Sequence, residues 1–296
     1  MLARTILAST GTIVGRANNY GTHLVTEILP ALIDEKLIAG GELMMLNAYY
    51  ERLTDVATEW TAAGIPFPVI HCEKDVGTLI SDAGAFYAVG NVDEAETAHS
   101  RALELFRLNC EMGALVRSSR MVIHLWGGLN SDRYISSNIE ILSELCNIIR
   151  PYGIRLLIEN VPSALYDPLI NWKKILPYCP EIGFVFDMRF GNLHRQIDAT
   201  LSDGAIVPYI EHVHISDHVG AERDFSSLRP ILHPGEGMID FDSIARKLNE
   251  IGYESTVTLE SPVIKEGGAD GGKLRRTLIY LNRLLLSWRD CFYETY

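Results

Sequence analysis

Four short apolar segments in the second half of the chain each end in a side chain that can bind a metal ion. The segments are LLIE, GFVFD, HVH and TVTLE, which end at Glu159, Asp187, His214 and Glu260. The first three side chains are about 28 residues apart, close to the roughly 30 residues of one strand–helix unit. They would converge only if the strands ran parallel around one axis, because the carboxyl ends of the strands then meet at one face. The spacing therefore predicts a closed parallel barrel.

Eight segments are predicted to be strands, and most are separated by sequences with helical periodicity. The predicted strands are Arg4–Ser9, Glu42–Leu46, Pro68–Cys72, Met121–Leu125, Arg155–Glu159, Gly183–Asp187, His212–Ser216 and Thr256–Glu260. Helical patterns lie at Tyr50–Ala63, Glu94–Met112, Ser137–Arg150, Phe241–Ile251 and Gly272–Ser287. We predict an α/β fold, a (β/α)8 TIM barrel, as a single domain over residues 1–296. The stretch from His218 to Ile239 is predicted to be a long loop on the active face.

The amino-acid composition and the net charge indicate what kinds of molecule the protein binds. The chain is 47% hydrophobic and 22% charged, which suits one large buried core. Its five cysteines are odd in number and form no C-x-x-C pair, which indicates a reducing, cytoplasmic setting rather than a disulfide framework. No apolar run approaches the roughly 18 residues of a membrane span. A net charge of −12 disfavours nucleic acid. We expect a small-molecule partner, and formation of a homo-oligomer stays open.

The strings LLIENV, FDMRF, HVHISD, PGEGMIDF and TLES, in this order and spacing, resemble the xylose isomerase-like TIM barrel superfamily. That superfamily contains sugar and sugar phosphate isomerases and epimerases, inosose dehydratases and class II apurinic endonucleases. The resemblance implies that one divalent cation is held by Glu159, Asp187, His214 and Glu260. It also implies that His71 and His124, which end the third and fourth predicted strands, contact substrate or further metals.

The chain departs from this family in two places. Many relatives have D-x-x-H after the sixth strand, with the histidine contacting substrate, but here that position is Phe190 and the nearest histidine is His194. Endonucleases with three zinc ions carry D-x-H before the Gly-x-Gly turn, whereas Arg229 and Ile231 stand there in this chain. Two zinc ligands are thus missing. Mononuclear proton-transfer chemistry is therefore favoured over phosphodiester cleavage.

Three carboxylates and one imidazole suit Mn²⁺, Mg²⁺ or Co²⁺, and Zn²⁺ also fits. Such an ion stabilises the enediolate that forms when a proton leaves the carbon beside a carbonyl. We assign Glu159 and Glu260 as the catalytic pair, one removing the proton and the other returning it. The expected activity is a sugar isomerase or epimerase. Open alternatives are an inosose- or dehydroshikimate-type dehydratase, an endonuclease and a non-catalytic barrel with a vacant site.

Several other side chains have both a functional and a packing interpretation. His71 and His124 are assigned to substrate binding together with Trp126, which either stacks on a sugar face or closes the core. His212 is expected to be a hydrogen-bonded core histidine. Asp217 is predicted either to orient His214 or to cap a loop. Three residues of the long loop are expected to be solvated, namely His218, Arg223 and His233.

Overall fold

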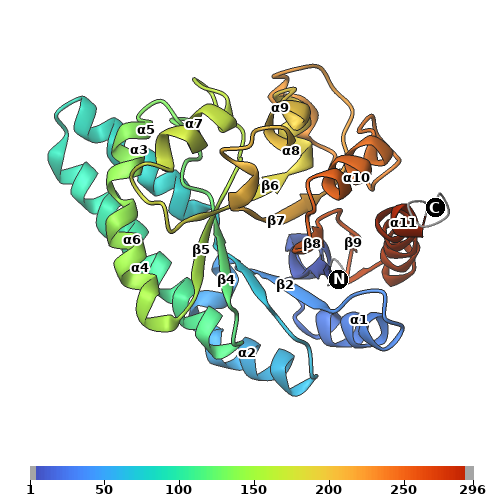
Figure 1. Ribbon diagram of the computed structural model, residues 1–296. Coiled ribbons are helices and arrows are strands. Elements are labelled where there is room, and N and C mark those ends of the chain that lie inside the picture. The colour runs from blue at the N-terminus through green and yellow to red at the C-terminus, as the bar shows by residue number, and fades with distance from the viewer. Residues whose placement is uncertain (1–4, 291–296) are drawn as a thin grey trace.

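Eight parallel strands close into one barrel in the computed structural model, which describes residues 5–290, with side chains to residue 285 (Figure 1). Each strand pairs with the next, and the first pairs with the eighth. The strands are β1 (Thr5–Ser9), β2 (Gly40–Met44), β3 (Val69–His71), β4 (Arg120–Ile123), β5 (Arg155–Glu159), β6 (Gly183–Asp187), β7 (Ile210–Ile215) and β8 (Thr256–Leu259). The prediction of a (β/α)8 barrel is confirmed. Arg4 of the predicted first strand, like Cys291, lies outside the described residues.

Helices surround the strands, as Figure 1 shows. They are α1 (His23–Asp34), α2 (Leu53–Ala62), α3 (Asp75–Ala88), α4 (Val92–Leu115), α5 (Ile135–Glu140), α6 (Leu142–Ile149), α7 (Pro168–Ile175), α8 (Met188–Leu193), α9 (Ile197–Leu201), α10 (Phe241–Glu250) and α11 (Gly271–Asp290). A short antiparallel pair, β9 (Ile264–Lys265) and β10 (Gly268–Ala269), precedes α11. None of these described helices has the length and hydropathy of a membrane span.

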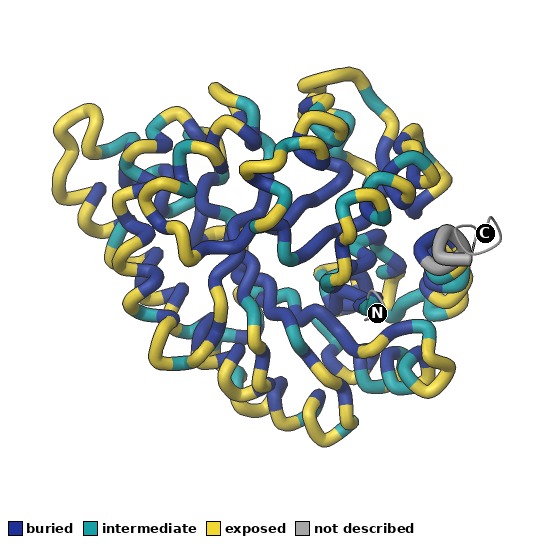
Figure 2. The backbone as a smooth tube through the Cα atoms, in the orientation of Figure 1, coloured by how far each residue is buried: buried dark blue, intermediate teal, exposed yellow. Residues whose placement is uncertain are grey.

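Apolar side chains form two layers, because successive residues of a strand point to opposite faces. A small inner cluster fills the barrel and contains Leu7, Val69, Val122, Leu157 and Val185. The larger cluster lies between the strands and the helices, and Ile158 belongs to it. Leu157 therefore points inward like Glu159, as predicted. Figure 2 shows the strands almost entirely buried and exposed residues concentrated on the outer helices.

The second strand begins earlier than the sequence indicates, at Gly40 instead of Glu42. Two consecutive glycines usually mark a turn, but here they continue the strand. A Cβ atom on Gly40 would lie 2.3 Å from the carbonyl oxygen of Pro66, so only glycine permits this close approach of the backbones. Glu42 is therefore the third residue of the strand, and its carboxylate is fully buried inside the barrel.

Candidate metal centre

The barrel brings together the four predicted ligands at one end. Glu159 and Asp187 are the last residues of β5 and β6, His214 lies near the end of β7, and Glu260 follows β8. Asp187 pairs with His214 in the register of neighbouring strands. Ligand atoms of all four residues lie within 4.8 Å of one another. The parallel strands thus produce the convergence that the spacing predicts.

The imidazole of His214 lies at the centre of this group. Its Nδ1 atom is 2.8 Å from Oε1 of Glu159 and 3.5 Å from Oε2 of Glu260. Oδ1 of Asp187 accepts the backbone N–H of Phe190 at 2.8 Å. Its Oδ2 atom and Oε1 of Glu260 are buried with no hydrogen-bond partner among the described residues. Unpaired buried carboxylate oxygens are costly, so these two atoms fit the donor set of a divalent cation.

The three carboxyl groups of this centre have pKa values that are shifted in different directions. Burial raises the pKa of Asp187 to about 6 and that of Glu260 to about 7, and the charge of Glu159 adds to both shifts. Burial would also raise the pKa of Glu159, but the His214 and His124 imidazoles beside it hold that pKa well below its ordinary value. Two neighbouring carboxyl groups with pKa values pushed apart are typical of an acid and base pair.

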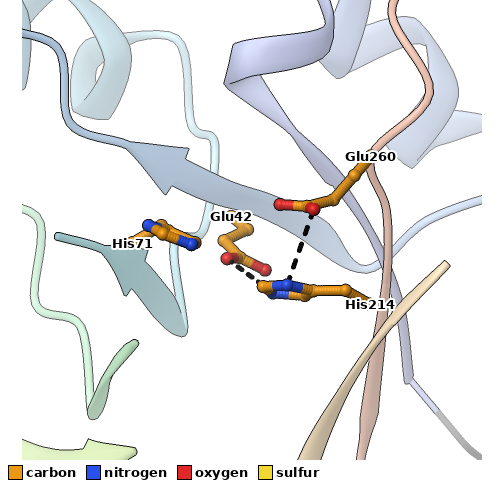
Figure 3. Close-up of side chains that lie close together, drawn as sticks. All are labelled: Glu42, His71, His214 and Glu260. Carbon is orange, nitrogen blue, oxygen red and sulfur yellow. Dashed lines mark hydrogen bonds and ion pairs between the residues drawn. The ribbon is translucent and has the colours of Figure 1, made fainter. Parts of the chain in front are cut away.

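Glu42 is the residue of this centre that the sequence analysis missed. Its side chain extends from β2 and is fully buried. Oε1 lies 3.0 Å from Nε2 of His214, and Oε2 lies 2.8 Å from Nε2 of His212. Figure 3 shows the Glu42 and Glu260 carboxylates both pointing toward the His214 imidazole. The available signal was a charged residue at the start of a predicted strand, where a buried carboxylate is seldom found unless it is paired.

The bond to Glu42 determines how His214 can act. Because Nε2 donates to Glu42, the ring is oriented with Nδ1 toward Glu159 and Glu260. Histidines that bind metals usually donate their other ring N–H to a carboxylate in this way. Although burial opposes a charged imidazole, the carboxylates Glu260, Glu42 and Glu159 raise the pKa of His214 well above its usual range.

The predicted substrate histidines both reach Glu159. Nε2 of His124 lies 2.7 Å and Nε2 of His71 lies 3.3 Å from Oε2 of that carboxylate. His71 is held from its other side, where Nδ1 contacts the carbonyl of Cys72 at 2.8 Å. The side chain of His124 is 21% exposed, whereas His71 is buried. Both residues border the centre, and His124 is the one that faces open space.

The backbone of His124 packs directly on α3, and this contact gives a prediction. A Cβ atom on Gly77 would lie 2.3 Å from the carbonyl oxygen of His124 and 3.0 Å from its Cβ. We expect Gly77→Ala to lower the free energy of unfolding by about 1–3 kcal/mol, because the added methyl overpacks a rigid contact. Urea denaturation measures this loss.

Gly204→Ala is the matched control for Gly77→Ala, since nothing lies within 4 Å of its added Cβ. We expect that change to stay within about 0.5 kcal/mol of the parent protein. Equal losses for the two variants would contradict the packing argument.

Trp126 is fully buried, and its indole N–H donates to the carbonyl of Val161 at 3.2 Å. It nevertheless lines the same pocket as His124. His212 is a core histidine, as expected, with Nδ1 2.5 Å from Oγ1 of Thr256 and Nε2 bonded to Glu42.

Asp217 organises the long loop instead of orienting His214. Its carboxylate accepts backbone N–H groups from Gly235, Gly237 and Ile239, at 3.1, 2.8 and 3.2 Å. Of its two predicted roles, the loop cap is therefore the observed one. The long loop itself is present between β7 and α10, as predicted.

The expectation of solvated loop histidines is wrong. His218 and His233 are both buried. Nδ1 of His233 lies 2.7 Å from Oγ1 of Thr277, and Nε2 of His218 lies 3.0 Å from Nδ2 of Asn192. The loop folds back onto the barrel, so its polar side chains find partners within the protein. Arg223 remains exposed and forms an ion pair with Asp167.

His194 does not replace the histidine that relatives carry at the position of Phe190. Its Nε2 accepts the backbone N–H of Ser163 at 3.2 Å. The neighbouring Arg189 is buried and donates to Oγ of Ser216 and to the carbonyl of Leu228, both at 3.0 Å. Arg189 thereby fastens the long loop to the end of β6.

Comparisons with known proteins agree with this architecture. A family model described as "Xylose isomerase-like TIM barrel" matches residues 38–283. Inosose isomerase of Bacillus licheniformis is 28% identical over 138 residues, which cover 42% of this chain and 46% of that enzyme. The match thus spans less than half of that relative's length.

Solved structures show the same fold at low identity. The IolI protein with a bound zinc atom is 16% identical, with a TM-score of 0.67 over 95% of this chain and 98% of that chain. D-Allulose 3-epimerase from Methylomonas sp. is 13% identical, with a TM-score of 0.66 over 97% of this chain and 99% of that chain. The family model covers most of the sequence, and the chain therefore belongs to the xylose isomerase-like TIM barrel family.

Proposed function

We propose that the protein is a sugar or sugar phosphate isomerase or epimerase that depends on one divalent metal ion. The observation that carries the proposal is the set of four convergent ligands with two buried, unpartnered carboxylate oxygens, on Asp187 and Glu260. Relatives named as inosose isomerases and epimerases support the reaction class. The substrate is a small carbohydrate or polyol.

The residues that would hold the ion are Glu159, Asp187, His214 and Glu260, and Mn²⁺, Mg²⁺, Co²⁺ and Zn²⁺ all suit this donor set. When bound, a divalent cation supplies Lewis-acid stabilisation of the charge that develops on substrate oxygens. Glu159 and Glu260 both approach Nδ1 of His214, at 2.8 and 3.5 Å, and they transfer the proton, one removing it and the other returning it. His71 and His124 both contact Glu159, so they hold that carboxylate in place. His124 is the one whose side chain is partly exposed, and it would contact the substrate directly.

A dehydratase would use the same ligands, so the two reactions must be separated by their products. Incubation of metal-loaded protein with an inosose would produce an unsaturated chromophore only if water were eliminated. Incubation with ketoses in D₂O would place deuterium on the reacting carbon without any absorbance change if the protein were an epimerase. The second outcome is the expected one.

Metal binding is expected to raise the melting temperature. At a free metal concentration about 100 times Kd, a ligand that binds only the native state adds about 2.7 kcal/mol. For a chain of this size that corresponds to a rise on the order of 4 °C. Scanning fluorimetry with Mn²⁺, Mg²⁺, Co²⁺ and Zn²⁺ measures it. The double change Glu159→Gln with Glu260→Gln should abolish the rise, and an equal rise in that variant would place the ion elsewhere.

We expect no cleavage of a duplex with an abasic site, at low salt with Zn²⁺ or Mn²⁺. The net charge of −12 disfavours a phosphate backbone, and Arg229 and Ile231 stand where endonucleases with three zinc ions have ligands. Gel electrophoresis of a labelled duplex tests this. Cleavage that disappears in Glu260→Gln would move the function to DNA repair.

A further inference from the structure

A pocket of about 390 Å³ opens directly beside the candidate metal centre. Its walls come from α3 and from the loops that follow β3, β4, β5 and β7, so it lies on the face where the strands end. His124 belongs to both places, because its Nε2 contacts Glu159 while its ring lines the pocket. A substrate held at the centre would therefore extend past His124 into this space.

Most side chains of the pocket wall are apolar. The wall includes Trp126, Leu129, Val161, Pro162 and Phe225. Leu129 is 96% exposed and Phe225 is 45% exposed. Lys74 lies on the rim and is itself exposed to solvent. The polar side chains of the wall are Lys74, Thr78, His124 and Ser131, and those of His124 and Ser131 already have partners within the protein. An apolar group in this pocket would therefore gain more by leaving water than a sugar hydroxyl would.

The pocket is rigidly built on its inner side. The buried carboxylate of Asp132 accepts the backbone N–H groups of Ala164, Leu165 and Tyr166, at 2.7, 2.8 and 2.7 Å. This joins the loop after β4 to the loop after β5. Ser81 on α3 adds a second brace, since its hydroxyl donates to the carbonyl of Ser131 at 2.7 Å. The two loops are therefore fixed in place by buried hydrogen bonds within the protein.

The outer wall of the pocket is the turn that carries Phe225, and residues of α8 and the position after it hold this turn in place. Arg189 donates to the carbonyl of Leu228, the last residue of the short helical turn Phe225–Leu228. The ring of Phe225 lies 6.2 Å from the ring of His194 in an edge-to-face arrangement. Arg189 and His194 follow Asp187 closely in sequence, so the element that supplies a metal ligand also positions the aromatic wall.

We propose that this pocket binds an apolar, aromatic-sized group attached to the sugar or polyol substrate, as in an aryl glycoside. The proposal rests on the proposed function, because it places the reacting carbons at the metal centre and the apolar group beyond His124. The preferred substrate would therefore be a carbohydrate with an apolar substituent, and not a free monosaccharide or a sugar phosphate.

The test measures binding without turnover. Phenyl glycosides of several sugars and their methyl counterparts are titrated into the Mn²⁺-loaded protein and followed by ligand-observed NMR. We expect the best phenyl glycoside to bind on the order of 10-fold more tightly than its methyl counterpart, because the phenyl ring buries more apolar area. Phe225→Ala and Leu129→Ser should each reduce that ratio to about 2 or less.

Tyr178→Ala is the matched control, since Tyr178 is another exposed aromatic residue that does not line this pocket. It should leave the phenyl-to-methyl ratio unchanged. Equal affinities for phenyl and methyl glycosides, including no binding of either, would overturn the proposal. So would a preference for sugar phosphates that is lost in Lys74→Ala but kept in Phe225→Ala.

Failure of the proposed function gives a different result from failure of the pocket. If the chain is not an isomerase, no substrate carbon exchanges its hydrogen in D₂O, while the phenyl preference survives. If the pocket does not bind an apolar group, exchange occurs with a free ketose and the protein shows no preference for phenyl over methyl glycosides. The Glu260→Gln variant separates the two further, because it should retain the phenyl preference while losing exchange.

Discussion

Glu260→Gln and Glu159→Gln are each expected to lower kcat by at least about 10³-fold. Proton transfer by a positioned side chain contributes roughly 10²–10⁴-fold, and each change also removes one charged ligand. The amide keeps the size of the carboxylate, so packing around His214 should be preserved. Turnover of a responsive ketose, followed by NMR, measures the loss.

Isotope exchange shows whether the two glutamates act through protons. With the parent protein in D₂O we expect solvent deuterium on the reacting carbon, and even partial incorporation supports proton transfer. Neither variant should exchange at a measurable rate. A product that keeps its original hydrogen would instead indicate a hydride shift and contradict the assignment of Glu159 and Glu260.

Glu42→Gln is expected to weaken metal binding by about 10–100-fold, the usual cost of losing a partner of a metal-binding histidine. The glutamine can still accept one imidazole N–H, but its NH₂ group would then face the nitrogen of the other histidine. The histidine that faces the NH₂ group keeps its bond only if its proton moves to Nδ1. In His214 that change would place a proton on the nitrogen that faces the metal centre. Isothermal titration with Mn²⁺ measures the affinity, and the melting temperature before metal addition checks that the fold is intact.

Glu211→Gln is the matched control for Glu42→Gln. Glu211 also lies in the barrel, at the start of β7, where its carboxylate pairs with Arg155. It is 27% exposed and lies at the opposite end of the strands from the ligands. We expect the Glu211→Gln variant to bind metal with the same affinity as the parent protein. Equal weakening in both variants would show a general effect on the barrel and would contradict a specific role for Glu42.

The barrel could be predicted from the sequence because the strand signal and the ligand signal coincide. LLIE and GFVFD are apolar runs closed by a charged residue, and the structure ends β5 and β6 at those residues, Glu159 and Asp187. The alternation of facing residues also follows from backbone geometry alone, which is why Leu157 and Glu159 could be placed on the same face.

Contacts between residues far apart in sequence could not be predicted in this way. Glu42 and His214 are 172 positions apart, and nothing local to either residue indicates the other. The buried positions of His218 and His233 depend on how the long loop folds back, which is determined by Asp217 and by packing against α11 through Thr277. Tertiary partners, not local periodicity, decide whether such polar residues are solvated.

The central claim is that one divalent ion binds among Glu159, Asp187, His214 and Glu260. Anomalous diffraction from crystals soaked in Mn²⁺, recorded on both sides of the manganese absorption edge, tests it most directly. We predict one peak per chain, within coordination distance of Oδ2 of Asp187, Oε1 of Glu260 and Nδ1 of His214. Absence of a peak after saturation, or a peak away from these atoms, would contradict the claim.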